Sequence, residues 1–532
     1  MIVDLASDDL DAEISADICI VGAGAAGVTL ALELSARGRS VVLLESGGLA
    51  EEAASQTLSE GESVGHPMAL EYGRYRVLGG STTHWTGRCA KLDPIDFQAR
   101  DWTPYSGWPF GRDVLESYYA RAARYCGFTE PWVADDAIPA TLGLTLPAFD
   151  PARVEPFAWR YAPQREIRRY RDWGRDYQDD LRQRDNIRVL LHANLVDIEP
   201  APSGERVVAA HAASLNGKRV RVQAESFVLC CGGVENARLL LHAAEAHPHT
   251  LIANPDMVGR FFMQHPRGKI AALDAEPATA RQLQDMFNVF SRRSGAQYEI
   301  GFALPESVQR QERLLNASVI LLYEADPQSA WEKLKRAAQA RRPESVGDLL
   351  GALTNPGEIA RNLVRRVLQG RHPVLETRAI DVIIDLEQAP DPDSRLSLAD
   401  QRDALGLKRV RVDWRIGEME RRTSARFAAL LAGEFERLGL GRLRLAPWLD
   451  DSGPIPAEAL GGTYHHIGAT RMAAGAASGV VDSDCKVYGA DNLYVQGCSV
   501  FPTGGHANPT LTIVAVALRQ ADILDTAHAR AA

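Results

Sequence analysis

The chain has 532 residues, enough to bury a large core and usually enough for more than one domain. Its formal net charge of −10 argues against nucleic acid as a partner, because binding phosphates requires a basic surface. Seven cysteines without a Cys-x-x-Cys pair indicate neither a disulfide framework nor a zinc site, so we expect a reducing compartment and no bound metal. An acidic N-terminus without an apolar leader, and no apolar run long enough to span a bilayer, predict a cytoplasmic protein with no membrane span.

The first predicted elements form a strand–helix–strand unit. A β-type run covers residues 17–21, a helical pattern covers residues 28–36, and a second apolar strand covers residues 40–44. The motif Gly-x-Gly-x-x-Gly joins the first strand to the helix. Such a motif is weak alone, but the flanking elements make it strong evidence for a dinucleotide site.

Each residue type in this unit has a physical role. Gly22 permits the tight turn, Gly24 lets the backbone approach a pyrophosphate, and Gly27 lets the helix pack close to the strand. The pyrophosphate would lie at the helix N-terminus, where free N–H groups favour negative charge. Glu45 ends the second strand, where a carboxylate accepts hydrogen bonds from ribose hydroxyls. This acid argues against NADP but does not separate NAD from FAD.

Two later segments alternate apolar and polar residues and predict half-buried strands, residues 380–387 and 408–414. Near the end of the chain, Asn508 and Pro509 precede an apolar run to Leu518, which predicts a helix with Asn508 as its N-cap. The positive end of that helix dipole would stabilise negative charge nearby.

Several segments in a fixed order resemble the glucose–methanol–choline (GMC) oxidoreductase family, which binds FAD. The segments are residues 18–27, 79–86, 228–241, 254–266, 464–472, 480–482, 491–495 and 501–510. Within the family, the His84-Trp85 pair is most similar to pyranose oxidases and bacterial sugar dehydrogenases.

The resemblance implies an α/β fold with two domains. A Rossmann-like FAD-binding domain is expected from residues 1–110, 190–270 and 455–532. A discontinuous substrate-binding domain, built on an antiparallel sheet, is expected from residues 111–189 and 271–454. The substrate pocket would lie between that sheet and the isoalloxazine ring.

The resemblance also implies cofactor contacts beyond the first unit. The loop with Gly80 and Thr82 is similar to the segment that lies against the flavin, and Leu195 matches the strand whose backbone meets the adenine. His84 matches a histidine that is often bonded covalently to the flavin, although it could instead pack over the ring. The remaining expected cofactor contacts are Asp491, Pro509 and Thr510.

Two residues are the expected catalytic pair. Removing a hydride from an alcohol carbon requires a base beside the hydroxyl, and His465 matches the family's catalytic histidine. Asn508 matches a His or Asn position that would hold the substrate oxygen, and its role as an N-cap competes with this interpretation.

These residues predict oxidation of a secondary alcohol of a sugar or glycoside to a ketone. Oxygen or another electron acceptor would reoxidise the flavin. The alternatives are a dehydrogenase of a non-sugar alcohol that passes electrons to a protein or quinone acceptor, and a non-redox lyase that keeps the flavin. The sequence is also compatible with a homo-oligomer.

Overall fold

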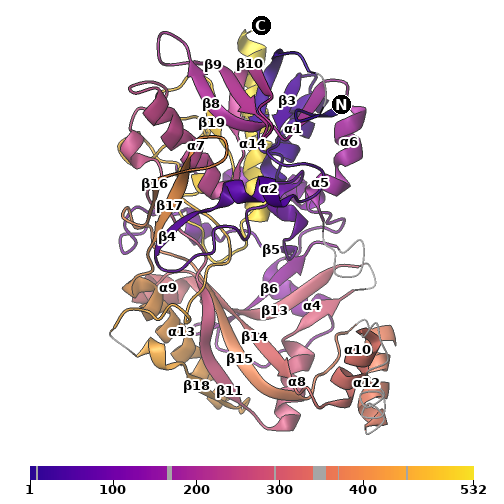
Figure 1. Cartoon of the computed structure of the whole chain (residues 1–532). Coiled ribbons are helices and arrows are strands. Elements are labelled where there is room, and N and C mark those ends of the chain that lie inside the picture. Colours follow the sequence, from indigo (N-terminus) through magenta and orange to yellow (C-terminus); the bar gives the residue numbers. More distant parts are fainter. Residues whose placement is uncertain are drawn as a thin grey trace.

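The computed structural model describes residues 1–7, 10–163, 171–292, 295–339, 355–368, 371–450 and 453–531. It has one large sheet in the upper half of Figure 1 and a second large sheet in the lower half. The long helix α14 (Thr510–Ala531) lies in the upper half, where both chain termini are found.

The first sheet is mainly parallel and has the order β1-β7-β3-β2-β10-β9-β8, with β19 beside β10. Its strands are β1 (Ile2–Asp4), β2 (Glu13–Val21), β3 (Val41–Leu44), β7 (Ile187–Leu191), β8 (Asn194–Pro200), β9 (Val207–Ala213), β10 (Arg219–Leu229) and β19 (Leu493–Val495). The predicted first unit is confirmed, because β2 and β3 are parallel neighbours and α1 (Ala25–Ala36) connects them. The helix begins three residues before the predicted start.

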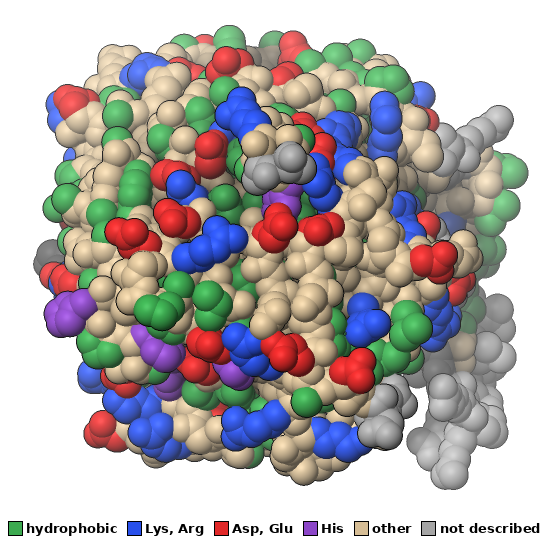
Figure 2. All heavy atoms as spheres, turned by 90° about the horizontal axis from the view of Figure 1, so that it is seen from above, with side chains coloured by type: hydrophobic (Ala, Val, Ile, Leu, Met, Phe, Trp, Pro, Cys, Tyr) green, Lys and Arg blue, Asp and Glu red, His purple; other side chains and the backbone are tan. Residues whose placement is uncertain are grey.

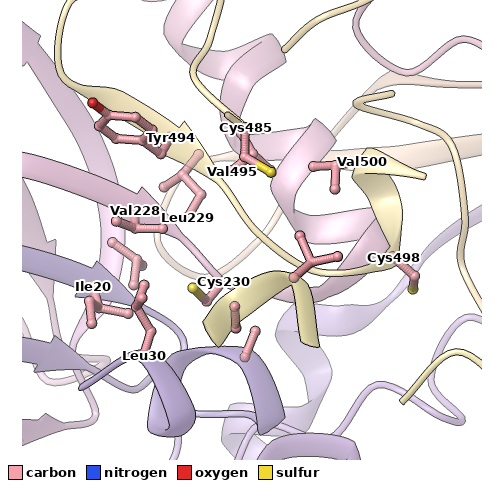
Figure 3. Close-up of a cluster of buried hydrophobic side chains, with 14 of the residues drawn as sticks. Ile20, Leu30, Val228, Leu229, Cys230, Cys485, Tyr494, Val495, Cys498 and Val500 are labelled. Atoms are coloured by element: carbon pink, nitrogen blue, oxygen red, sulfur yellow. The ribbon is translucent and has the colours of Figure 1, made fainter. Parts of the chain in front are cut away.

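The core of this half forms where the two central strands meet their covering helices. Ile20 of β2 and Val228 of β10 are fully buried, and Leu30 of α1 packs near them (Figure 3). Cys230, which follows β10, and Cys485 and Val495 from the C-terminal segment close the same cluster. Strands covered on both faces are apolar at nearly every position, which explains why residues 18–21 and 41–44 read as continuous apolar runs.

The second sheet is antiparallel, with the order β18-β11-β15-β14-β13-β6-β5 and β12 beside β13. Its strands are β5 (Arg88–Cys89), β6 (Glu155–Tyr161), β11 (Arg267–Asp274), β12 (Val289–Ser291), β13 (Gln297–Ala303), β14 (Ala317–Ala325), β15 (Thr377–Leu386) and β18 (Arg442–Leu445). The helix α13 (Glu418–Arg437) packs on it through Phe427 and Phe435. The expected α/β fold with an antiparallel second sheet is therefore confirmed.

A third sheet was not expected. The strand predicted over residues 408–414 exists as β17 (Lys408–Trp414), but it does not join the second sheet. It pairs antiparallel with β16 (Arg395–Arg402) and parallel with β4 (Gly61–Gly65). This pairing ties the loop region after β3 to the C-terminal half of the chain.

The remaining helices lie around these sheets. They are α2 (Ala53–Gln56), α3 (Asp113–Tyr125), α4 (Ile138–Thr141), α5 (Trp173–Asp176), α6 (Gln178–Gln183), α7 (Gly232–Ala246), α8 (Pro277–Met286), α9 (Glu306–Glu312), α10 (Ala330–Gln339) and α12 (Pro356–Leu368). Helix α3 packs along α14, where the Tyr119 hydroxyl lies 3.0 Å from the Thr512 hydroxyl. The domain boundaries stay a prediction, and this contact favours grouping α3 with the first sheet.

Charge is mixed on the face seen from above in Figure 2. Lys and Arg side chains lie among Asp and Glu side chains there, as the modest net charge suggests. Among the described residues, no helix has both the length and the apolar character that crossing a membrane requires.

A buried ion pair gives a test of this packing. Both Arg100 and Glu387 have fully buried side chains, and two N–H groups of the guanidinium reach the carboxylate at 2.8 and 2.5 Å. We expect Arg100→Met to lower the free energy of unfolding by about 3–5 kcal/mol, because it leaves an unpaired buried carboxylate. Urea unfolding followed by circular dichroism measures this change.

The matched control is Arg310→Met. Arg310 pairs with Glu306 at 2.6 Å, but both side chains are more than two-fifths exposed. Such a pair contributes about 0–1 kcal/mol. Equal losses in the two variants would contradict a structural role for the buried pair.

Candidate active site

A cavity of about 550 Å³ passes the carboxyl ends of the central strands. Val21, Leu44 and Cys230 line it at the ends of β2, β3 and β10. Its wall continues to the loops at residues 80–86, 463–466 and 508–510. Ligands of parallel α/β sheets bind at this edge.

The first turn and the acid after β3 form one end of the cavity. Gly22 has a φ of +99°, which requires glycine, and the Ala23 N–H donates to the Glu45 carboxylate at 2.9 Å. The Gly47 N–H donates to the same carboxylate at 2.9 Å. Burial raises the pKa of Glu45 while these hydrogen bonds act against the rise.

The space at this end fits FAD. A Cβ atom placed on Gly24 would have no protein atom within 4 Å, so the turn is open where a pyrophosphate must approach. A Cβ on Gly27 would lie 1.9 Å from the Gly22 carbonyl oxygen, so this glycine serves helix packing and is not on the cavity wall. Leu195 lies on the wall at the start of β8, where an adenine would be expected.

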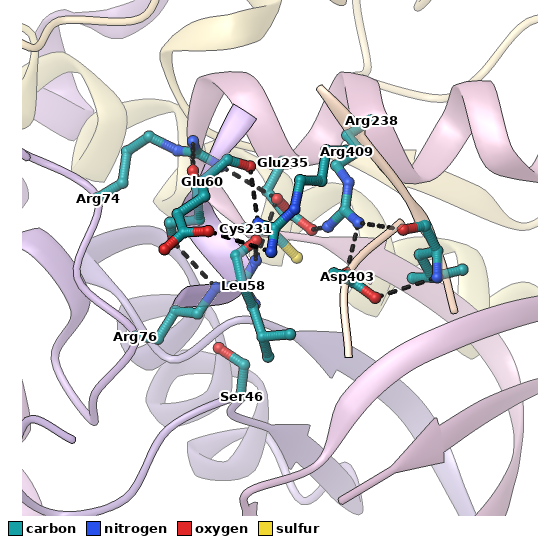
Figure 4. Close-up of polar contacts among 12 residues, drawn as sticks. Ser46, Leu58, Glu60, Arg74, Arg76, Cys231, Glu235, Arg238, Asp403 and Arg409 are labelled. Atoms are coloured by element: carbon teal, nitrogen blue, oxygen red, sulfur yellow. Dashed lines mark hydrogen bonds and ion pairs between the residues drawn. The ribbon is translucent and has the colours of Figure 1, made fainter. Parts of the chain in front are cut away.

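A cluster of guanidinium groups adds positive charge to the same wall (Figure 4). Arg74 and Arg76 each lie 3.2 Å from the Glu235 carboxylate, which Arg238 also contacts at 2.8 Å. Burial acts to raise the pKa of Glu235, but the three cations lower it to about 2. With Asp403 pairing Arg238 at 2.6 Å, three cations face two anions. Guanidinium groups on this wall could donate hydrogen bonds to pyrophosphate oxygens.

Arg74 and Arg76 could not be predicted as site residues, since they lie in an irregular loop outside any motif. Both residues line the cavity. An Arg-x-Arg pair just before the Gly79-Gly80 turn was the only available signal.

The loop expected against the flavin also lies on the wall. Gly80 has a φ of +56°, and the buried Thr82 hydroxyl donates to the Gly79 carbonyl at 2.7 Å and accepts from the Trp173 N–H at 3.0 Å. The His84 ring stacks on Tyr75 with 4.0 Å between ring centroids. Its side chain is 46% exposed, and one ring nitrogen contacts the Glu51 carboxylate.

The structure brings the two expected catalytic side chains together from separate loops. Nε2 of His465 lies 3.5 Å from Nδ2 of Asn508, and both residues line the cavity. Helix α14 begins at Thr510, two residues after Asn508, and the Ile513 N–H donates to the Pro509 carbonyl at 2.8 Å. Pro509 and Thr510 also lie on the wall. The helix therefore begins later than an Asn508 N-cap would require.

The other edge of the His465 ring faces protein. Its Nδ1 lies 2.8 Å from Nδ1 of His265 and 2.9 Å from the Thr463 hydroxyl. Burial, followed by the charges of His265, His466, Arg267 and Arg88, holds the pKa of His465 well below its usual range. The imidazole is therefore neutral near pH 7 and can accept a proton.

The structure gives the positions of three further residues near the cofactor-binding or catalytic segments. His265 was missed as an individual site residue, although it lies in the segment 254–266 that carried the resemblance. His466 is buried, stacks on Phe262 at 5.9 Å, and has a pKa lowered to about 3 by burial. Asp491 is exposed before β19 and does not line the cavity, so its expected cofactor contact stays a prediction.

Known proteins resemble this chain over most of its length. Residues 17–295, just over half of the chain, match the FAD dependent oxidoreductase family, and residues 390–517 match the GMC oxidoreductase family. The fructose dehydrogenase large subunit of Gluconobacter japonicus is 22% identical over 96% of this chain and 98% of its own length. A 6'''-hydroxyparomomycin C oxidase of Streptomyces lividus is 25% identical over 94% and 90%. A C-glycoside 3-oxidase of Microbacterium trichothecenolyticum is 34% identical over 22% of each chain.

Solved structures share the fold. Formate oxidase superposes with a TM-score of 0.60 at 15% identity, covering 98% of this chain and all of that one. A fungal aryl-alcohol oxidase superposes with a TM-score of 0.58 at 14% identity, covering 96% and 99%.

Two glycine variants test the cofactor end. Gly24→Ala places a methyl group in open space, so we expect unchanged thermal unfolding of the apoprotein but FAD binding weaker by about tenfold or more. Gly27→Ala forces the helix away from the turn, so we expect a loss of about 1–3 kcal/mol in the free energy of unfolding. Flavin absorbance per protein and calorimetry separate these effects. The comparison is made in a His84→Ala background, which cannot hold flavin covalently, and equally tight FAD binding with and without Gly24→Ala would contradict this placement.

Proposed function

Because the chain belongs to the GMC oxidoreductase family and is an FAD-dependent alcohol oxidoreductase, we propose that it oxidises a secondary alcohol of a sugar or glycoside to a ketone. The observation that carries the proposal is the neighbouring pair His465 and Asn508 on the wall of the cavity that begins at the nucleotide turn. The names of the relatives support the substrate class, since they include a fructose dehydrogenase and a glycoside oxidase.

FAD, when bound, supplies the acceptor for the hydride. The protein's own part is to remove the hydroxyl proton and hold the oxygen. His465 accepts the proton at Nε2, and the Asn508 amide donates a hydrogen bond to the same oxygen. The low pKa of His465 keeps its ring neutral near pH 7, so the ring can accept a proton. The N-terminus of α14, at Pro509 and Thr510, presents the positive end of its dipole to the cavity.

Anaerobic stopped-flow mixing tests the proposal. A panel of free sugars, glycosides and non-sugar alcohols is added, and bleaching of the flavin absorbance is followed. We expect bleaching by sugars or glycosides. No bleaching by any alcohol would overturn the proposal, and turnover with the flavin oxidised throughout would indicate the lyase.

The second candidate is a dehydrogenase that passes electrons to a protein or quinone. The relative from Gluconobacter japonicus favours it, because its name describes one subunit of a larger enzyme. Fast reoxidation by air indicates an oxidase, whereas slow reoxidation by air with fast reduction of dyes or quinones indicates the dehydrogenase. Flavin bleaching by non-sugar alcohols, but not by sugars or glycosides, would also favour the dehydrogenase. The cytoplasmic location and a homo-oligomer stay predictions.

Replacing the proposed base gives a quantitative prediction. We expect His465→Ala to slow flavin reduction by about 10²–10⁴-fold, since a positioned base contributes that much. The wild-type rate should fall only below a pH of about 6.5, because protonation inactivates the base and burial lowers its pKa. Stopped-flow rates across pH measure both effects.

The control is His528→Gln, which removes a buried imidazole on α14 that contacts Ser226 and Glu225. This histidine does not line the cavity, so the reduction rate should stay within about twofold. Equal losses in both variants would mean that His465 has no special role.

We also propose that His84 is bonded covalently to the flavin. The supporting observation is that this ring lines the cavity and is held in place by Tyr75. After acid denaturation the yellow colour should stay with wild-type protein and leave the His84→Ala protein. Flavin released from the wild type would mean that the ring only packs against it.

A further inference from the structure

We propose that His265 and Thr463 are positioning residues that fix the proton of neutral His465 on Nδ1 and leave Nε2 as the free base. The inference deepens the proposed function of His465 and rests on it. The supporting observation is an unbroken series of hydrogen-bonding groups that runs from the Gly504 carbonyl to the cavity.

The series starts at a group that can only accept. Nε2 of His265 lies 3.2 Å from the Gly504 carbonyl oxygen, so this nitrogen carries a proton and donates it. Burial lowers the pKa of His265 to about 4, so the ring is neutral near pH 7 and carries one ring proton. Nδ1 of His265 therefore presents a lone pair.

The Thr463 hydroxyl also faces His465 as a hydrogen-bond acceptor. Its hydroxyl lies 3.1 Å from the His265 carbonyl oxygen and donates its only proton there. The hydroxyl oxygen keeps lone pairs and lies 2.9 Å from Nδ1 of His465.

Two acceptors thus face one nitrogen of His465. Nδ1 is 2.8 Å from the lone pair of His265 and 2.9 Å from that of Thr463, and a bare Nδ1 would leave three lone pairs facing one another. The proton of the neutral ring therefore lies on Nδ1. Nε2 then has the lone pair and faces the amide of Asn508 at 3.5 Å. This is the orientation that a base beside the cavity needs.

The series cannot act as a proton wire. A proton accepted at Nε2 of His465 would have to continue through Nδ1 to His265 and then to the Gly504 carbonyl, which is a poor proton acceptor. The proton therefore stays on His465 and leaves through the cavity. Both acceptors stabilise the charged ring, because N–H groups of a cation donate stronger hydrogen bonds.

His265 acts behind the base, not on the substrate. It is 2% exposed and does not line the cavity. The charged or titratable groups around His465 are His265, His466, Arg267 and Arg88, and those around His265 include Asp385, His506 and Glu387. None of these groups changes in the variants below except His265 itself.

Four variants separate positioning from folding. His265→Gln keeps an amide oxygen to accept from Nδ1 and an NH₂ to donate to Gly504, whereas His265→Leu removes both. Thr463→Val removes the second acceptor at nearly constant volume, and the fourth variant combines His265→Leu with Thr463→Val. Flavin content and thermal unfolding identify any variant that does not fold.

We expect flavin reduction by the best alcohol to stay within about threefold in His265→Gln. The rate of flavin reduction should fall about tenfold in His265→Leu and in Thr463→Val, and about 100-fold in the double variant. KM should be unchanged in all three. Equal rates in His265→Gln and the double variant would overturn the inference. A loss that appears in KM and not in kcat would also overturn it.

A spectroscopic readout is independent of activity. In holoenzyme labelled with ¹⁵N-histidine, the signals of residue 465 are assigned by their loss in His465→Asn. We expect the proton on Nδ1 in wild type and a shift toward Nε2 in the double variant. A proton on Nε2 in wild type would overturn the inference. If no alcohol reduces the wild-type flavin, the proposed function fails, whereas the ¹⁵N spectrum still decides the proton's position.

Discussion

Close backbone contacts at three glycines connect the nucleotide turn to the proposed base. A Cβ on Gly22 would lie 2.6 Å from the Cys230 carbonyl oxygen, and one on Gly27 would lie 1.9 Å from the Gly22 carbonyl oxygen. A Cβ on Gly233, at the start of α7, would lie 1.8 Å from the His466 carbonyl oxygen. The ends of β2 and β10 and the loop of His465 can therefore enclose one cavity only because these positions lack side chains.

Buried titratable groups have opposite charge states at the two ends of that cavity, although burial disfavours charge at both. At the nucleotide end, Glu235 is charged because three guanidinium groups outweigh the cost of desolvation. At the catalytic end, burial keeps His265 and His466 neutral, with pKa values lowered to about 4 and about 3. The first environment suits a pyrophosphate and the second suits a proton acceptor. Local partners, not depth, decide the difference.

The sequence was most informative where the signal is local. The first strand–helix–strand unit could be predicted because its glycines, apolar runs and acid are close together in the chain. The bounds of β17 could be predicted from alternation, but its partner β4 could not, because strand pairing between distant segments has no local signature. Arg74, His265 and Thr463 lie in irregular loops, where no periodicity shows which way a side chain faces. The contact expected for Asp491 was suggested by a family motif alone and stays a prediction, because this residue is exposed and lies outside the cavity.

The two roles considered for Asn508 compete for one carboxamide. As an N-cap it would bond to the first N–H groups of the helix, and as a substrate ligand it must face the base. Because α14 begins at Thr510, Pro509 takes the position before the helix and Asn508 is displaced toward His465. The first N–H groups of a helix have no partner within it, so the same displacement leaves those of α14 available to the cavity. Pro509, placed before the helix, thus leaves the Asn508 amide free to donate to the substrate oxygen and the positive end of α14 free to face the cofactor.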